Sequence, residues 1–253
     1  MTTSKRIYQG ELMGKYWEAV LLGSRYEENE LVRRLLKDDS VLDVGCGPGS
    51  HTAYLSKEKH VIGIDTNRYF IKRAKQECKN KGNYENVDLI MADMTKLPFQ
   101  SGVVDNVINI ISLGFFSDEE NESVLTETVR VLKKYGKYLQ QNYYYPRSKR
   151  PLNWVDEYIK APKGFSVEKR KKYDPKTKRV HSVGTVEYLR TGEKIDLDEE
   201  TRIFYLYELK KLLKKNGLKK IRVYGSLVLK DLDLEYREFD SKKFGLMTIV
   251  SEK

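Results

Sequence analysis

The residues best suited to chemistry form a glycine-rich loop directly after a short apolar run. Positions 41–50 read Val-Leu-Asp-Val-Gly-Cys-Gly-Pro-Gly-Ser. Glycines at alternate positions let a backbone turn tightly and approach a ligand with no side chain in the way. Ser50 is expected to cap a helix through about Lys57, whose free N–H groups would face an anionic part of the ligand. The segment therefore predicts a nucleoside site at the end of a strand.

Two acidic residues accompany this loop. Asp43 lies inside the first apolar run, and Asp65 ends the second, where its carboxylate can accept hydrogen bonds from both hydroxyls of a ribose. A dinucleotide fingerprint has the spacing G-x-G-x-x-G, whereas this loop is G-x-G-x-G and follows an acid. Asp43 would repel a pyrophosphate but attract a ligand with an ammonium and a sulfonium. The sequence therefore disfavours an NAD-dependent oxidoreductase.

The elements that would hold these residues alternate between strand and helix. Apolar runs that predict strands lie at 41–44, 61–65, 87–91, 103–112 and 137–145. Helical patterns fill the intervals, and the last of them, from Asp118 to Leu132, is expected to be closed by Gly136. This alternation predicts a parallel sheet covered by helices on both faces, with right-handed crossovers.

The pattern changes after the fifth strand. Prolines and a glycine interrupt residues 146–164, and turn-forming sequences then separate several strand-like runs. The runs 180–189 and 199–205 are expected to pair in an antiparallel sheet. The chain closes with a helix at 206–216 and with strands at 221–224 and 246–250.

Composition indicates a globular protein. With 253 residues, 40% hydrophobic and 33% charged, the chain suits one large α/β domain with a modest insertion. No apolar run approaches the ~20 residues that span a bilayer, and the start lacks the apolar stretch of a signal peptide, so we expect a cytoplasmic protein without a membrane anchor. Cys46 and Cys78 fit a reducing compartment and provide no metal framework.

The net charge of +10 is concentrated in the second half of the chain. Residues 133–222 contain 25 Lys or Arg against 11 Asp or Glu, which leaves 22 against 26 for the rest. A basic surface can attract RNA or an acidic small molecule. A lysine-rich solvated surface explains the same count without any ligand.

Five segments in order resemble the motifs of the class I S-adenosylmethionine-dependent methyltransferases. The glycine loop is similar to their motif I, the run ending at Asp65 to their second motif, and Met91-Ala92-Asp93-Met94 to their third. The segments 98–107 and 132–137 resemble the lead into the fourth strand and the turn before the fifth, where this chain has Tyr135 in place of a glycine and lacks a proline. The resemblance covers residues 40–145 densely and the end of the chain loosely.

This resemblance implies both a fold and a cofactor site. The fold is α/β: a Rossmann-like methyltransferase fold with a seven-stranded, mostly parallel sheet, helices on both faces and a small antiparallel β insertion. S-adenosylmethionine would be the cofactor, with Asp93 at its adenine amino group and Met94 against the ring. No metal is implied. The residues expected to bind the cofactor are Asp43, Gly45, Cys46, Gly47, Gly49, Asp65, Thr66, Asp93, Met94 and Asn109.

The same resemblance divides the chain into four parts. Residues 1–39 would form a helical lid segment, and 40–145 the cofactor-binding core. Residues 146–205 would form an insertion on the substrate side, and 206–253 would complete the core sheet.

The candidates for catalysis are His51 and Tyr143. His51 follows the glycine loop, near the expected position of the methionine end of the cofactor, where neutral imidazole could act as a general base. A surface or capping histidine is the commoner outcome at a helix start. Tyr143 and Asn142 end the fifth strand and could line a substrate pocket, although tyrosines on a strand pack as often as they bind.

Aromatic residues elsewhere are candidates for the substrate pocket. Phe115 and Phe116 follow the fourth strand, on the side where this family transfers the methyl group, and are equally well explained as core residues. Methyltransferases of nucleic-acid bases carry an Asn/Asp-Pro-Pro-Tyr/Phe motif there, which this chain lacks. Tyr8 and Tyr16 could belong to a lid over the cofactor.

The leading hypothesis is a methyltransferase that acts on a nitrogen or oxygen of a small molecule. One alternative is an RNA methyltransferase in which the basic region 163–179 grips phosphates. Another is a catalytically silent, cofactor-binding regulatory subunit. No feature of the sequence indicates an oligomeric state.

Overall fold

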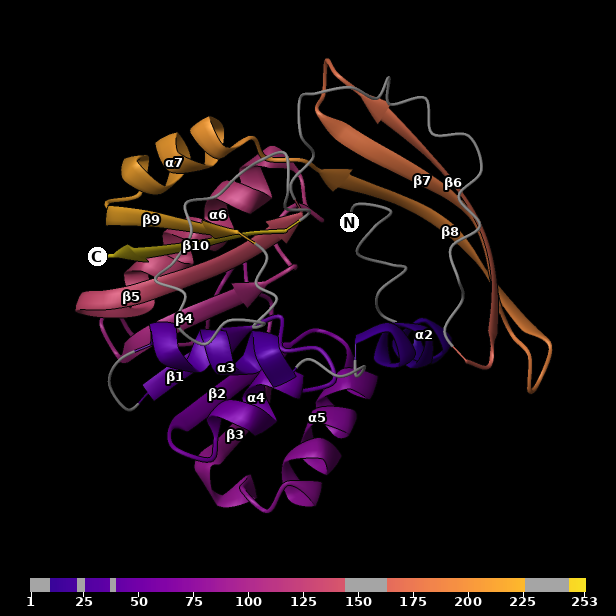
Figure 1. Ribbon diagram of the computed structural model, residues 1–253, viewed down its shortest axis with the longest axis horizontal. Coiled ribbons are helices and arrows are strands. Elements are labelled where there is room, and N and C mark those ends of the chain that lie inside the picture. Colours follow the sequence, from indigo (N-terminus) through magenta and orange to yellow (C-terminus); the bar gives the residue numbers. More distant parts are fainter. Residues whose placement is uncertain (1–9, 22–25, 37–39, 144–162, 226–245) are drawn as a thin grey trace.

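The computed structural model describes residues 10–21, 26–36, 40–143, 163–225 and 246–253 (Figure 1). These residues form a seven-stranded sheet and a separate three-stranded sheet, which confirms the fold class expected from the sequence. Strands β1 to β5 of the larger sheet are parallel, and β10 runs antiparallel to both β5 and β9. In spatial order its strands are β3 (Val87–Met91), β2 (His60–Asp65), β1 (Ser40–Val44), β4 (Val104–Ile110), β5 (Leu132–Tyr143), β10 (Leu246–Glu252) and β9 (Lys219–Gly225).

Helices cover both faces of the larger sheet because alternate strand residues point to opposite faces. They are α3 (Tyr26–Leu35), α4 (Ser50–Leu55), α5 (Arg68–Asn80), α6 (Asp118–Val131) and α7 (Leu206–Lys215), with a short 3-10 turn at Tyr84–Asn86. On one face Leu42 packs with Leu125 of α6 and Leu209 of α7. On the other face Val41 packs with Val32 of α3. Each fully buried leucine or valine contributes about 1.5–3 kcal/mol, so β1 is stabilised from both sides.

The smaller sheet is antiparallel and is packed on its own helix. It consists of β6 (Phe165–Asp174), β7 (Arg179–Tyr188) and β8 (Glu193–Arg202). The helix α2 (Glu11–Leu21) lies between this sheet and α5 (Figure 1). The apolar contact joins Leu12, Met13 and Tyr16 of α2 to Phe165, Val167, Val186 and Leu197.

Two expected helix caps are wrong, each for a different reason. The N-cap of α4 is Gly49 at φ 88°, so Ser50 is already inside the helix and caps nothing. The helix α6 ends at Val131, one residue before the expected Leu132, but Gly136 does not close it, because Leu132 is already extended and pairs with Val104 in the sheet. The ladder between β4 and β5 then shifts register, and Tyr135, at φ 65°, bonds Lys253 instead.

Two expected strands have the wrong limits. The fourth strand ends at Ile110 because Ile111 adopts φ 56°, a left-handed conformation that turns the chain away from the sheet. The strand β8 begins at Glu193, not at 199, because Ile195 and Leu197 alternate with acidic residues and bury one face. Its acidic residues had masked this period-two pattern.

None of the helices in the described ranges has the length and apolar character needed to cross a bilayer. The same residues contain no group of three or more His, Cys, Asp and Glu side chains arranged to hold a metal ion.

Candidate functional site

The expected cofactor-binding residues lie near the point where the strand order of the larger sheet reverses, between β1 and β4. β1 pairs with β2 on one side and with β4 on the other. The helix after β1 packs on one face and the helix after β4 on the opposite face. Ligands of open α/β sheets bind at the carboxyl ends of strands at such a switch point.

The glycine loop is shaped by steric necessity. Its first two N–H groups, of Gly45 and Cys46, both donate to the Ile64 carbonyl at 2.9 Å, which folds the loop against β2. A Cβ on Gly45 would lie 2.9 Å from the Cβ of Ser112, and 3.0 Å from the Cε of Met94. The loop therefore brings Met94, an expected adenine contact, and Ser112 to motif I.

Gly47 and Gly49 complete the turn, both with positive φ (53° and 88°). A Cβ on Gly49 would lie 2.7 Å from the Cα of Ala74 in α5, so α4 and α5 can approach only because this residue has no side chain.

Asp65 joins the glycine loop to the start of α5. Its Oδ2 accepts a hydrogen bond from the Gly47 amide at 3.0 Å, and its Oδ1 accepts one from the Asn67 amide at 2.8 Å. Asn67 in turn caps α5 through its side chain. Burial raises the pKa of Asp65 to about 6, although backbone N–H donors act in the opposite direction.

Asp43 is almost completely buried on β1, behind the loop. Its Oδ2 accepts a hydrogen bond at 2.7 Å from the Thr52 hydroxyl of α4. Burial, and secondarily the charge of Asp65, raise the pKa of Asp43 to about 7. In the described part of the chain, both carboxylates accept their hydrogen bonds from neutral donors. Such a pair of acids favours a positively charged ligand, and the ammonium and sulfonium of S-adenosylmethionine fit that requirement.

The remaining cofactor candidates differ in their surroundings. Cys46 is buried, and burial raises the pKa of its thiol well above the usual value, so it stays a neutral packing residue. Thr66 is exposed beside Asp65. Asp93 is exposed after β3, and its Oδ1 accepts bonds from the Thr95 amide at 2.8 Å and the Thr95 hydroxyl at 2.7 Å. The carboxylate of Asp93 thus stands apart from the buried acids.

Asn109 is the second-last residue of β4, beside the glycine loop, and is fully buried. Its Oδ1 accepts bonds from the Ser112 hydroxyl at 2.6 Å and from the Leu113 amide at 3.1 Å, while its Nδ2 is buried without a hydrogen bond. Ser112 Oγ also lies 3.1 Å from the Val44 carbonyl. Sequence reasoning missed Ser112 as a site residue, although a hydroxyl three residues after Asn109 at a strand end is the visible signal.

The acceptor-side candidates are only partly brought together. Asn142 is buried and donates to the Leu113 carbonyl at 3.2 Å, while its own Oδ1 accepts from Gln140. Phe115 and Phe116 are half-buried, and Phe116 packs against the main core. The backbone of Tyr143 pairs with Leu246, while its side chain lies outside the described structure.

The other candidates for catalysis or for the substrate pocket are His51, Tyr16 and Tyr8. His51 is buried in the first turn of α4, next to the glycine loop. Tyr16 is buried under the smaller sheet, edge-on to Phe165 with ring centroids 5.7 Å apart. Tyr8 lies outside the described residues.

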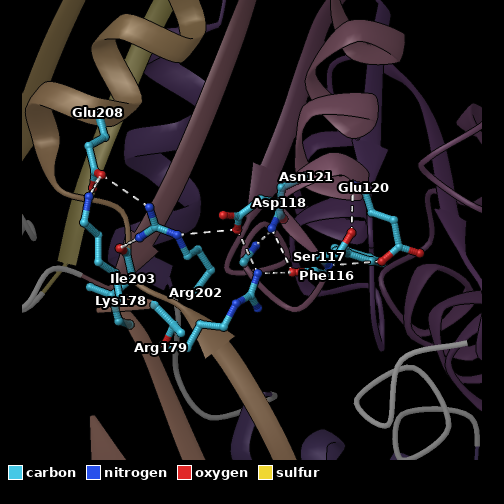
Figure 2. A network of polar contacts seen from close by, with 12 residues as sticks. Phe116, Ser117, Asp118, Glu120, Asn121, Lys178, Arg179, Arg202, Ile203 and Glu208 are labelled. Atoms are coloured by element: carbon cyan, nitrogen blue, oxygen red, sulfur yellow. Dashed lines mark hydrogen bonds and ion pairs between the residues drawn. The ribbon is translucent and has the colours of Figure 1, made fainter. Parts of the chain in front are cut away.

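The loop after β4 is pinned to the smaller sheet (Figure 2). The Gly114 carbonyl accepts from the Arg202 amide at 2.7 Å, and the Gly114 amide donates to Asn121 at 2.9 Å. The Phe116 carbonyl accepts from Arg179 at 3.0 Å and from the Asn121 side chain at 2.9 Å. A Cβ on Gly114 would lie 2.7 Å from the Arg202 carbonyl. This contact therefore requires glycine.

Charged side chains reinforce the same junction. Figure 2 shows Arg202 between two carboxylates, 3.5 Å from Asp118 and 3.3 Å from Glu208. Arg179 also pairs with Asp118 at 2.8 Å, and Lys178 with Glu208. Sequence reasoning missed these residues because nothing in a linear pattern pairs a β8 arginine with an acid 84 positions earlier.

The comparisons with known proteins agree with this architecture. Residues 41–136 match a family model described as a methyltransferase domain. The ubiquinone/menaquinone biosynthesis C-methyltransferase UbiE of Wigglesworthia glossinidia brevipalpis is 33% identical over 106 residues, which are 40% of this chain and 42% of that protein. The chain thus spans less than half the length of this relative.

Two further proteins match most of the chain. The uncharacterized protein MJ1252 of Methanocaldococcus jannaschii is 29% identical over 205 residues, 80% of this chain and 70% of that protein. The crystal structure of an S-adenosylmethionine-dependent methyltransferase from Clostridium acetobutylicum superposes with a TM-score of 0.67 at 16% identity, covering 98% of this chain and 96% of that one. Residues 41–136 thus carry a methyltransferase domain, and the chain has the Rossmann-like fold of this S-adenosylmethionine-dependent methyltransferase.

Proposed function

We propose that this protein transfers the methyl group of S-adenosylmethionine to a nitrogen or oxygen of a small molecule. The observation that carries the proposal is the pair of acids, the buried Asp43 and the half-buried Asp65, around a G-x-G-x-G loop at the switch point of the sheet. Burial raises the pKa values of both carboxyl groups, so a cationic cofactor beside them would favour their charged forms.

Each of these residues has a role in the proposed binding. Asp65 would hold the ribose, because its carboxylate is fixed at the end of β2 by the Gly47 and Asn67 amides. Asp43 and the glycine loop would receive the amino-acid end, and Met94 would contact the adenine. The buried Nδ2 of Asn109 would donate to the cofactor near the same loop.

The chemistry asked of the protein is modest. The cofactor supplies an electrophilic methyl group on a sulfonium, which an acceptor lone pair displaces in line. The chain must hold the acceptor in position and exclude water. The loop after β4, pinned by Arg202 and Arg179, and the smaller sheet are the elements we assign to that task.

Two alternatives differ from this proposal in the acceptor of the methyl group: a carbon atom, and RNA. The UbiE relative is a C-methyltransferase, so a carbon acceptor is the competing outcome. The RNA alternative relied on the basic region 163–179, but Lys169, Lys178 and Arg179 of that region pair with Glu199, Glu208 and Asp118. Cations bound to internal acids are less available to phosphates, which favours a small acceptor.

Cofactor binding is tested by calorimetric titration of the purified chain with S-adenosylmethionine and with NAD. We expect binding of the first alone. Asp65→Ala and Asp65→Asn should weaken it by ~10- to 100-fold, since each removes a charge-assisted contact to the ribose. Asp88→Ala, an exposed acid on the neighbouring strand β3, is the matched control and should bind as the wild type does. Unchanged affinity in both Asp65 variants would refute the assignment of the ribose site.

The acceptor atom is tested with a methyl-labelled cofactor and a metabolite extract. The carbon-13 shift of the transferred methyl group distinguishes nitrogen, oxygen and carbon acceptors. A product methylated on carbon would contradict the proposed acceptor. If the cofactor binds, no metabolite is labelled and RNA is the only labelled product, the result would favour the RNA alternative.

A further inference from the structure

The smaller sheet presents a buried ion pair on the face that packs against α2. We call this face the roof face. It includes Phe165 and Val167 of β6 and Leu197 of β8, which contact α2. Because strand residues alternate, Lys169 of β6 and Glu199 of β8 lie on the same face. Their side chains form an ion pair and are only 8% and 5% exposed.

The register shows how the two charges meet across an intervening strand. Lys169 is opposite Gly184 of β7, and Glu199 is opposite Ser182. The residues between the charges therefore have no side chain or a very short one. Gly184 is moreover irreplaceable, since a Cβ there would lie 1.9 Å from the Glu168 carbonyl oxygen. The small residues of β7 thus leave room for the Lys169 side chain to reach Glu199 across that strand.

Stability alone does not account for this pair. Its neighbours on the roof face, Val167 and Leu197, are apolar and buried. Replacing a buried ion pair by well-packed apolar residues is often neutral or stabilising, because desolvation offsets the attraction of the charges. An apolar pair at these positions would simply extend the contact with α2, so the charges require another explanation.

The location of the sheet supplies that explanation. At one end, Arg202 and Arg179 fix it to the loop after β4 through the Gly114 and Phe116 carbonyls. At the other end it packs on α2, which rests on α5: a Cβ on Gly14 would lie 2.5 Å from the Tyr69 ring. The sheet therefore extends from the end of β4 to the helix that follows Asp65. Its middle rows, which carry Lys169 and Glu199, lie between these two anchors, and the arrowheads of β4 and β5 point toward this sheet (Figure 1).

We propose that Lys169 and Glu199 recognise a zwitterionic acceptor, with the lysine binding its anionic group and the glutamate its ammonium group. This inference rests on the proposed methyltransferase function. The pair has no net charge, so a ligand with one charge would leave the other side chain buried without a counterion. A zwitterion replaces both partners and keeps the site neutral. Lys171 lies on the same face but is half-exposed, so it does not belong to the buried pair. The methylated atom lies elsewhere in the acceptor.

The test uses matched probes: free amino acids, the corresponding decarboxylated amines, and the corresponding N-acetylated acids. Binding of each to the full chain with S-adenosylhomocysteine is measured by calorimetry. At least one amino acid should bind ~10-fold or more tightly than both of its singly charged analogues. The apolar variant Lys169→Met/Glu199→Leu should lose this preference, keep its melting temperature or raise it, and bind S-adenosylmethionine within ~2-fold of the wild type.

The swapped variant, Lys169→Glu/Glu199→Lys, separates recognition from structure. It preserves an ion pair but reverses its direction, so a structural role would survive the swap and recognition would not. Retained amino-acid preference in both double variants would overturn the inference, as would a wild type that binds S-adenosylmethionine but none of the amino acids. Failure of S-adenosylmethionine binding itself would be seen separately, and would overturn the proposed function as well.

Discussion

Asp43 and Asp65 make the stability of the cofactor-free protein depend on pH. Their pKa values, about 7 and about 6 in the folded protein, exceed the ordinary aspartate value near 3.8. Between these limits the folded state holds protons that the unfolded state has released. The free energy of unfolding therefore falls as pH rises from about 4 to about 7, which is the reverse of the usual behaviour of paired carboxylates.

Asp43→Asn should remove most of this dependence. The amide oxygen can still accept from Thr52, but no buried charge forms. At about pH 8 the free energy of unfolding of the variant should therefore be ~1–4 kcal/mol higher than that of the wild type. Urea titrations of the cofactor-free protein at about pH 5 and about pH 8 measure the difference. Asp88→Asn, at an exposed site, should leave the wild-type slope intact. An Asp43→Asn slope equal to that of the wild type would show that this carboxylate does not titrate as described.

Gly49 and Gly102 test the steric role of the glycine loop at the level of one methyl group. Both have positive φ, 88° and 69°, so alanine strains either backbone by a similar amount. Only at Gly49 does the new Cβ meet a neighbour, Ala74, whereas Gly102 faces open space. Gly49→Ala should cost ~2 kcal/mol or more beyond Gly102→Ala in urea unfolding. Equal costs would mean that α4 and α5 do not need the close approach.

Arg202 connects the smaller sheet to α6 and α7, so its replacement should destabilise the contacts among all three. It is buried and faces Asp118 and Glu208. We expect Arg202→Met to lower the free energy of unfolding by ~1–3 kcal/mol, since Glu208 loses a charged partner. Hydrogen exchange should rise in the loop after β4. Lys176→Met, in the exposed turn between β6 and β7, is the control and should change neither quantity.

At the scale of elements, the sequence predicts what depends on local pattern. The strands of β1 to β3 and the end of α7 are confirmed, because apolar runs and an Asn-Gly stop are short-range signals. The start of β8 and the closure of α6 by Gly136 are wrong, because an acidic strand and a register shift are decided by tertiary packing. A second local signal went unused: Ser117 and Glu120 form a capping box at the start of α6.

Within the candidate site, too, residues that belong to local motifs could be predicted and contacts between distant elements could not. Motif residues such as Asp43, Asp65 and Gly45 could be named from spacing alone, and the structure places them together. The pairs Arg202–Asp118 and Lys169–Glu199 join residues of different elements, 84 and 30 positions apart. No periodicity in the chain encodes them, so only the folded arrangement reveals them.

At the scale of the whole molecule, the two sheets are separate and are linked through the loop after β4. The larger sheet presents the acids and glycines, and the smaller sheet, held by α2 and Arg202, extends from the loop after β4 to α5 (Figure 1). The proposed division of labour follows the parts expected from the sequence: a cofactor core at 40–145 and a substrate-side insertion at 146–205. The cofactor and the acceptor would then be bound by different sheets.

The most direct test of the whole account is a crystal structure of the chain with S-adenosylhomocysteine. The account predicts the ribose hydroxyls on the Asp65 carboxylate and the amino-acid end against the loop from Gly45 to Gly49. A nucleoside bound elsewhere, with Asp65 still directed only at the Gly47 and Asn67 amides, would contradict it.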